Sequence, residues 1–167
     1  MQASQKIPFN QFITQLLDAD HPLAPNYFYR LSDLEPDEIQ ALAEVWTQIP
    51  LWRRQSIMED VEVLSADDML LSFVDFSILA LQDEDAGIRR QAVRSLWEYD
   101  EDELAPVFMR MVQSDPDVEV RAAAAGALGR YIYNGEVEEL SPVLLNQIEE
   151  LLLQIIRGED APKVRRF

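Results

Sequence analysis

Two arginines occupy repeated positions at which they could bind an anion. Arg89 follows Asp85 at the same spacing as Arg121 follows Asp117, and the two pairs are 32 residues apart. The planar guanidinium fork suits phosphate and carboxylate groups, so an anion site is one interpretation. The other is structural, because aspartate and arginine at a recurring position can form charge-assisted hydrogen bonds between successive turns. We favour this structural ladder of Asp85, Arg89, Asp117 and Arg121, because both pairs hold the same place in their repeats.

Clusters of acidic residues are a second candidate for chemistry. They fall at residues 59–62, 83–85, 100–103 and 136–139. Carboxylate oxygens suit calcium and magnesium, but a helix–loop–helix calcium site starting at Asp83 needs glycine at its sixth position and glutamate at its twelfth. The chain has Ile88 and Arg94 there. Acids at helix starts also stabilise the helix dipole, so we expect no dedicated metal site and no cofactor.

Groups that could perform catalysis are sparse. His21 is the only histidine, in a segment flanked by proline, and the chain has no cysteine. A single histidine cannot form a multi-histidine metal site, and no motif identifies a serine that His21 could activate. The lack of cysteine excludes disulfides, thiolate metal sites and a cysteine nucleophile. We predict that the protein is not an enzyme and that His21 is exposed.

The charge of the chain restricts its partners. Its 167 residues include 31 acidic and 14 basic side chains, a formal net charge of −17. This field repels nucleic acid and anionic lipid and attracts a basic protein. No apolar stretch reaches the roughly 18 residues that a membrane span requires. We therefore expect a cytoplasmic protein that binds neither nucleic acid nor membranes, and we expect the tryptophans in its core: Trp46, Trp52 and Trp97.

Apolar residues recur at helical spacing along most of the chain, which predicts an all-α fold. The expected helices cover residues 9–18, 36–48, 52–64, 69–81, 86–98, 102–114 and 142–156, with a further helix around 122–127. The stretch 69–81 is apolar over most of its circumference, so we expect it to be a core helix. The 32-residue period predicts stacked helical repeats.

The segment from residue 159 to 167 resembles the start of another repeat, since Val164 and Arg165 match Val120 and Arg121. The preceding helix carries an apolar stripe over 143–156 that is wide enough to need cover on two sides. This pattern favours two hypotheses: further repeats follow, or the C-terminal helix is covered by self-association in a homodimer.

The repeated pattern Asp-x-x-[Ile/Val]-Arg-x-x-Ala-x-x-x-Leu, found at 85–96 and 117–128, resembles the HEAT-repeat superfamily. Its short period is most similar to the HEAT-like repeats described in phycobilisome lyases, and residues 29–38 resemble the entry region of bacterial HEAT-repeat proteins. The resemblance implies a short right-handed α-solenoid of antiparallel helix pairs. Residues 1–64 would form an N-terminal helical cap region, and residues 65–167 the repeats, the last truncated at 159–167.

The resemblance also implies a function: a non-catalytic scaffold or adaptor that recognises a protein partner through its concave face and acidic edges. If the second helices line that face, as in the family, the outward side chains are contact candidates. These are Arg110, Gln147, Glu150, Gln154 and Arg157. Two alternatives are a HEAT-like enzyme or enzyme-associated protein acting on a bilin or nucleic acid, and a purely structural domain that self-associates. The identity of the partner and the oligomeric state do not follow from the sequence.

Overall fold

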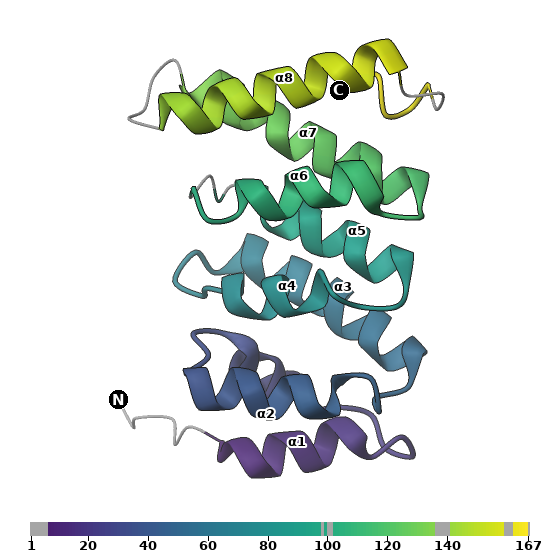
Figure 1. The fold of residues 1–167 in the computed structure, drawn as a ribbon. Coiled ribbons are helices and arrows are strands. Elements are labelled where there is room, and N and C mark those ends of the chain that lie inside the picture. Colours follow the sequence, from purple (N-terminus) through teal and green to yellow (C-terminus); the bar gives the residue numbers. More distant parts are fainter. Residues whose placement is uncertain (1–6, 98, 100–101, 136–140, 159–161, 167) are drawn as a thin grey trace. The chain divides into compact units, whose positions relative to one another are not determined.

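The computed structural model describes residues 7–97, 99, 102–135, 141–158 and 162–166. Within them every regular element is a helix, so the predicted all-α class is confirmed (Figure 1). The elements are α1 (Phe9–Leu17), the 3-10 helix η1 (Pro25–Leu31), α2 (Pro36–Trp46), α3 (Leu51–Asp67), α4 (Val74–Ala80), α5 (Ala86–Ser95), α6 (Ala105–Ser114), α7 (Val118–Gly135) and α8 (Pro142–Gly158).

The chain forms two compact units, an N-terminal unit (Met1–Ile88) and a C-terminal unit (Arg89–Phe167). The division into a cap region of 1–64 and repeats of 65–167 stays a prediction, as does the right-handed superhelical twist.

Proline and acidic side chains define where the helices begin. Pro36 lies in the first turn of α2, where its missing N–H costs no hydrogen bond. Glu35 and Glu38 form a capping box around this turn, in which the Glu35 backbone N–H donates to Glu38 Oε2 at 3.2 Å. Pro50 similarly precedes α3. Local sequence chemistry therefore fixes the helix starts in the N-terminal unit.

In the N-terminal unit, α2 packs against α1 and α4 (Figure 1). The Trp46 ring meets the Phe76 ring edge to face, with centroids 5.4 Å apart. Leu42 and Ile57 are also almost fully buried, so the core draws on the inner sides of α2, α3 and α4. Burying these side chains is the main favourable term in holding the helices together.

The predicted core helix over 69–81 is wrong in its first half. α3 continues to Asp67, residues 68–73 form a loop, and α4 covers only Val74–Ala80. The Asp33 backbone N–H donates to the Ser72 carbonyl at 2.9 Å, and the Ser72 N–H donates to Ser32 Oγ at 3.0 Å. These bonds hold the segment outside a helix. Met69 and Leu70 consequently lie at the loop tip, 95% and 89% exposed.

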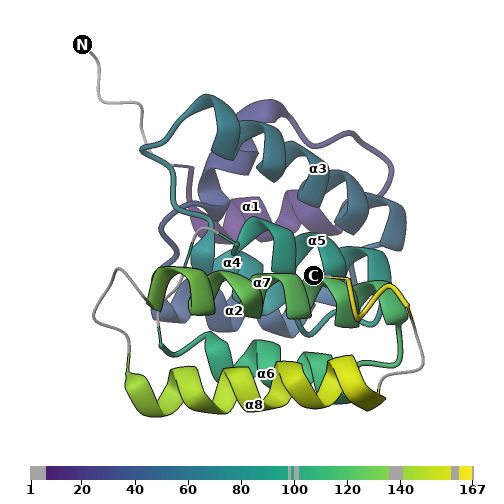
Figure 2. The same cartoon turned by 90° about the horizontal axis from the view of Figure 1, so that it is seen from above.

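In the C-terminal unit, α7 packs against both α6 and α8, and Figure 2 shows α6 and α8 on the same side of α7. Ala124 and Ala125 of α7 are fully buried, as are Phe108 of α6 and Ile148 of α8. Small side chains on one helix let larger ones on its neighbours approach closely. The predicted pairing of a helix rich in small residues with helices rich in large ones matches this packing.

The segment after α8 folds back on the C-terminal unit. Val164 is fully buried, and the Lys163 ammonium forms an ion pair with the Glu119 carboxylate in the first turn of α7. Residues 159–161 and 167 of the predicted additional repeat lie outside the described residues. Val164 therefore covers part of the apolar interior of this unit.

The tryptophans divide between core and surface. Trp46 is 3% exposed, as predicted, but Trp52 and Trp97 are 56% and 55% exposed, so the prediction that all three lie in the core is wrong. Each exposed ring carries an arginine over it: Arg53 lies 5.0 Å from the Trp52 ring centroid and Arg130 lies 4.8 Å from that of Trp97. A cation over the ring face makes these partly exposed positions favourable.

Candidate functional site

Arg89 and Arg121 both donate hydrogen bonds to Asp115 at the turn between α6 and α7. Arg89 Nε donates to Asp115 Oδ2 and Arg89 Nη2 donates to Asp115 Oδ1, both at 2.8 Å. Asp115 also accepts the Asp117 backbone N–H at 2.9 Å, and Arg121 Nη1 donates to the Asp115 carbonyl at 2.9 Å. Burial alone would raise the pKa of Asp115, but the hydrogen bonds from Arg89 and the Asp117 N–H, with the charges of Arg89 and Arg121, hold the pKa below its ordinary value.

Asp85 and Asp117 each accept backbone N–H groups at the start of a helix. Asp85 Oδ1 accepts from Ile88 at 3.0 Å, in the first turn of α5. Asp117 Oδ1 accepts from Glu119 at 2.8 Å and from Val120 at 3.1 Å, in the first turn of α7. These bonds satisfy N–H groups that have no partner within the helix.

A matching arrangement in the N-terminal unit was not predicted from the sequence. Arg54 of α3, only 2% exposed, donates from Nη1 to Asp83 Oδ2 at 2.6 Å and from Nη2 to Glu84 Oε1 at 2.8 Å. Trp46 Nε1 donates to the same Asp83 oxygen at 2.6 Å. Asp83 stands two residues before Asp85, as Asp115 stands before Asp117, and this sequence signal could have identified the carboxylate that accepts the arginine.

The arginines of the N-terminal unit all point inward. Arg30, Arg53 and Arg54 are each 2–3% exposed. Arg53 donates from Nη1 to the carbonyls of Gln15 and Leu16 at 2.9 and 3.2 Å, beside the end of α1. Arg30 forms an ion pair with Glu38 and lies 5.1 Å from the ring centroid of Phe9. These contacts bind parts of the unit together and withdraw the three guanidinium groups from its surface.

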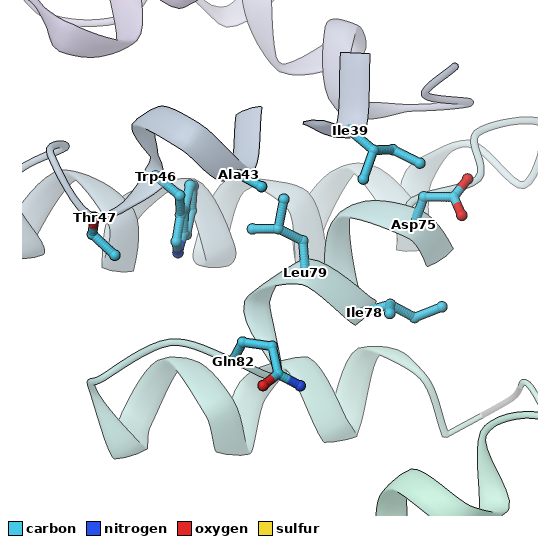
Figure 3. A pocket seen from close by; sticks show the side chains of 8 residues that line it. All are labelled: Ile39, Ala43, Trp46, Thr47, Asp75, Ile78, Leu79 and Gln82. Carbon is cyan, nitrogen blue, oxygen red and sulfur yellow. The ribbon is translucent and has the colours of Figure 1, made fainter. Parts of the chain in front are cut away.

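A groove about 430 Å³ in volume lies between α2 and α4. Its lining is mostly apolar and comprises Ile39, Ala43, Trp46, Thr47, Asp75, Ile78, Leu79 and Gln82. Figure 3 shows Leu79 of α4 pointing toward Ala43 of α2, with Asp75 at the end near Ile39 and Thr47 at the end near Trp46. Sequence reasoning did not identify this groove. The sequence feature that could have indicated the groove is the apolar pair Ile78–Leu79. It lies between Phe76 and Ala80, which are both buried.

A second, smaller recess of about 260 Å³ lies where η1 and the segment before it meet α3. Pro22, Phe28 and Trp52 line it together with Arg53 and Asp60. The Arg53 guanidinium is already bonded to backbone carbonyls, so this recess offers a mixed surface and no dedicated ionic site.

The five predicted contact residues are all exposed: Arg110 of α6 and Gln147, Glu150, Gln154 and Arg157 of α8. The spacing of the α8 residues places them along one side of the helix, opposite the side that buries Ile148 and Ile155. α6 and α8 contact one another. The C-terminal unit thus carries a polar strip on its second helices, which we call the α8 strip.

Metal-binding groups do not gather in the part of the chain that the structure describes. There, no group of three or more histidine, cysteine, aspartate or glutamate residues could hold a metal ion. His21 has a 74% exposed side chain, as predicted, and its Nδ1 lies 2.9 Å from Asp18 Oδ2. That hydrogen bond, with one from the Asp20 backbone N–H, lowers the pKa of Asp18. Among the described helices, none is long and apolar enough to cross a membrane.

Comparison with known proteins adds one finding. Residues 74–151 match the family model for HEAT repeats. A search of the curated proteins found no match to this chain, and a search of the solved structures found none either.

Proposed function

Residues 74–151 belong to the HEAT-repeat family, and from this premise we propose that the protein is a non-catalytic scaffold or adaptor that recognises a protein partner. HEAT repeats commonly serve as protein-interaction scaffolds and typically carry no catalytic machinery. The resemblance derived from the repeated pattern at 85–96 and 117–128 agrees with this match. A bilin-lyase or nucleic-acid-processing activity has no motif in the sequence to support it.

The observation that most supports the proposal is the α8 strip. Gln147, Glu150, Gln154 and Arg157 are exposed, and the interior of the unit is filled by other side chains of the same helix. Folding of α8 therefore leaves these side chains available to a partner. With Arg110 of α6 they offer hydrogen-bond donors, acceptors and both signs of charge, as the rims of protein interfaces do.

The charge of the protein supports a basic partner. A net charge of −17 speeds the encounter with a positively charged protein and disfavours nucleic acid and anionic membranes. In this proposal the protein acts in the cytoplasm, with residues 1–64 as the cap region of a repeat array. The rate of association with the partner should fall as salt rises, because salt screens exposed charges.

Photo-crosslinking tests the proposal. A photoreactive amino acid replaces Gln147 or Gln154 on the α8 strip, and Gln55, an exposed residue of α3, provides the matched control. In cells that produce the protein, we expect discrete protein adducts at Gln147 and Gln154 that are absent at Gln55. No adduct at the strip, or the same pattern at all three positions, would contradict the assignment of the strip.

A second candidate function is self-association through α8. Val143, Leu153 and Ile156 remain 66%, 40% and 48% exposed, and exposed apolar side chains on one helix can form part of a protein interface. Light scattering across a concentration series would show a dimer if these side chains meet in a second copy. In that case Ile156→Lys would shift the mass toward the monomer, whereas Arg157→Lys would not. A monomeric wild-type protein would rule this candidate out.

A further inference from the structure

The charge of the protein is concentrated in its N-terminal unit. Residues 1–88 contain 16 acidic side chains and 4 basic ones, whereas residues 89–167 contain 15 and 10. Within the described residues 7–88, the basic side chains other than His21 are Arg30, Arg53 and Arg54, all buried and bonded inward. The described surface of this unit therefore presents carboxylates with no exposed lysine or arginine between them.

The α2–α4 groove lies on this acidic surface and has an apolar floor. Trp46 is nearly buried beneath it, while Ala43 and Ile78 stand exposed at its sides. Asp75 is the one charged residue of the lining, and it is exposed at the end of the groove near Ile39 (Figure 3). An apolar side chain can thus enter the groove while a neighbouring cation stays in water beside a carboxylate.

The groove is long enough for about two turns of a helix. It follows α4, which has 7 residues and so is about 10 Å long. Two turns of a helix cover a similar length, and an amphipathic helix presents apolar side chains at intervals of three and four residues to such a groove. The flanking walls are themselves helices, and a third helix can pack between their side-chain ridges.

We propose that the α2–α4 groove binds the apolar face of a short basic amphipathic helix of a partner protein, with a lysine or arginine of that helix paired with Asp75. The charge complementarity of the N-terminal unit favours this occupant over an acidic or neutral helix. The inference goes beyond the proposed function, because it assigns a second surface on helices other than those of the α8 strip. Either surface can fail its test without the other.

A pair of model peptides tests the proposal on the full-length protein. The first is an amphipathic helix of about 14 residues, four turns, built from leucine and lysine with the leucines on one side. The second carries glutamate in place of every lysine. Fluorescence anisotropy of labelled peptide gives the dissociation constant. The NMR cross-peak of the Trp46 indole N–H reports whether the peptide reaches the groove, because Trp46 lines it.

Two pairs of variants separate binding in the groove from attraction to the acidic surface. Ala43→Trp fills the groove from an exposed position, and Ala66→Trp places the same side chain on an exposed position of α3 that does not line it. Asp75→Asn removes the carboxylate at the end of the groove, and Glu59→Gln removes an exposed carboxylate of α3. Circular dichroism checks that each variant keeps its helical content.

We expect the leucine–lysine peptide to bind and to shift the Trp46 cross-peak, and the leucine–glutamate peptide not to bind. Ala43→Trp should weaken binding at least about tenfold, since it removes the apolar contact, while Ala66→Trp leaves it unchanged. Asp75→Asn should weaken it about threefold, as expected for an exposed ion pair, and more than Glu59→Gln does. The proposal is wrong if the peptide does not bind, if Ala43→Trp has no effect, or if the two neutralising variants act equally. None of these results would affect the crosslinking test of the α8 strip.

Discussion

Replacing Asp115 by asparagine tests the role of the repeated arginine and aspartate. The Asp115 side chain is 6% exposed and that of Arg89 11%, and two hydrogen bonds of 2.8 Å join them. An asparagine side chain at this position keeps one acceptor oxygen but loses the charge and the second acceptor. The Asp115→Asn variant therefore removes the Asp115 charge that pairs with the Arg89 guanidinium in a largely buried position.

The expected cost follows from these contacts. Breaking a fully buried ion pair costs about 3–5 kcal/mol, and losing one hydrogen bond to a charged group about 1.5–3 kcal/mol. Solvent reaches the edge of this turn and screens the charge, so we take the lower range and expect a loss of about 2 kcal/mol. With a urea dependence of about 1–1.5 kcal/mol per M, the unfolding midpoint falls by roughly 1–2 M.

The assay is urea unfolding followed by circular dichroism, with Glu103→Gln as the control. Glu103 is exposed, so this variant loses the same charge without breaking the pair, and we expect its midpoint to change little. Arg89→Met combined with Asp115→Asn should cost much less than the sum of the two single variants, because both remove the same interaction.

The pH dependence supplies an independent check. The pKa of Asp115 is lower in the folded protein than its ordinary value, so its charge adds stability above the unfolded-state pKa of about 3.9. That stability is lost as the pH falls through the lower, folded-state pKa. The difference in the free energy of unfolding between wild type and Asp115→Asn should therefore be largest at neutral pH and shrink below about pH 4. A difference independent of pH, or a loss no greater than that of Glu103→Gln, would refute the reasoning.

Three further substitutions test other parts of the structure. Arg54→Met removes the guanidinium that donates to Asp83, whose side chain is fully buried, and should cost about 3–5 kcal/mol in thermal or urea unfolding. Val164→Ala removes fully buried methyl groups and should cost about 1–2 kcal/mol, while Arg165→Ala, at an exposed position, should cost almost nothing. Gly129→Ala places a methyl group on α7 where, apart from the adjacent residues and the helix's own backbone, no atom lies within 4 Å. The variant should raise stability by about 0.5–1 kcal/mol, and no gain in the unfolding midpoint would show that the helix is strained there.

The sequence predicted the helical class and most helix starts because those features depend on nearby residues. Pro36 with its capping box, Pro50 before α3 and Pro142 in α8 are local signals. The HEAT assignment also followed from spacing, and the family match at 74–151 confirms it.

Contacts between distant residues explain what the sequence did not predict. Met69 and Leu70 look like core residues by composition, but the hydrogen bonds of Ser72 with residues 32–33 keep their loop out of a helix. Hydropathy likewise did not distinguish Trp46, which is buried against Phe76, from the exposed Trp52. The arginine partners Asp83 and Asp115 lie 29 and 26 residues from Arg54 and Arg89, beyond the range of local pattern. The α2–α4 groove likewise could not be predicted from local pattern, because it depends on which helices are neighbours.

The most direct test of protein recognition is to identify the class of molecule that the surface contacts in the cell. Photoreactive residues at Gln147, Gln154 and Ala43, with Gln55 as the control, sample the α8 strip, the α2–α4 groove and an exposed side of α3. Our account predicts adducts at the first three positions that protease removes and nuclease leaves intact, with none at Gln55. Adducts that nuclease removes, or adducts equally abundant at Gln55, would contradict it.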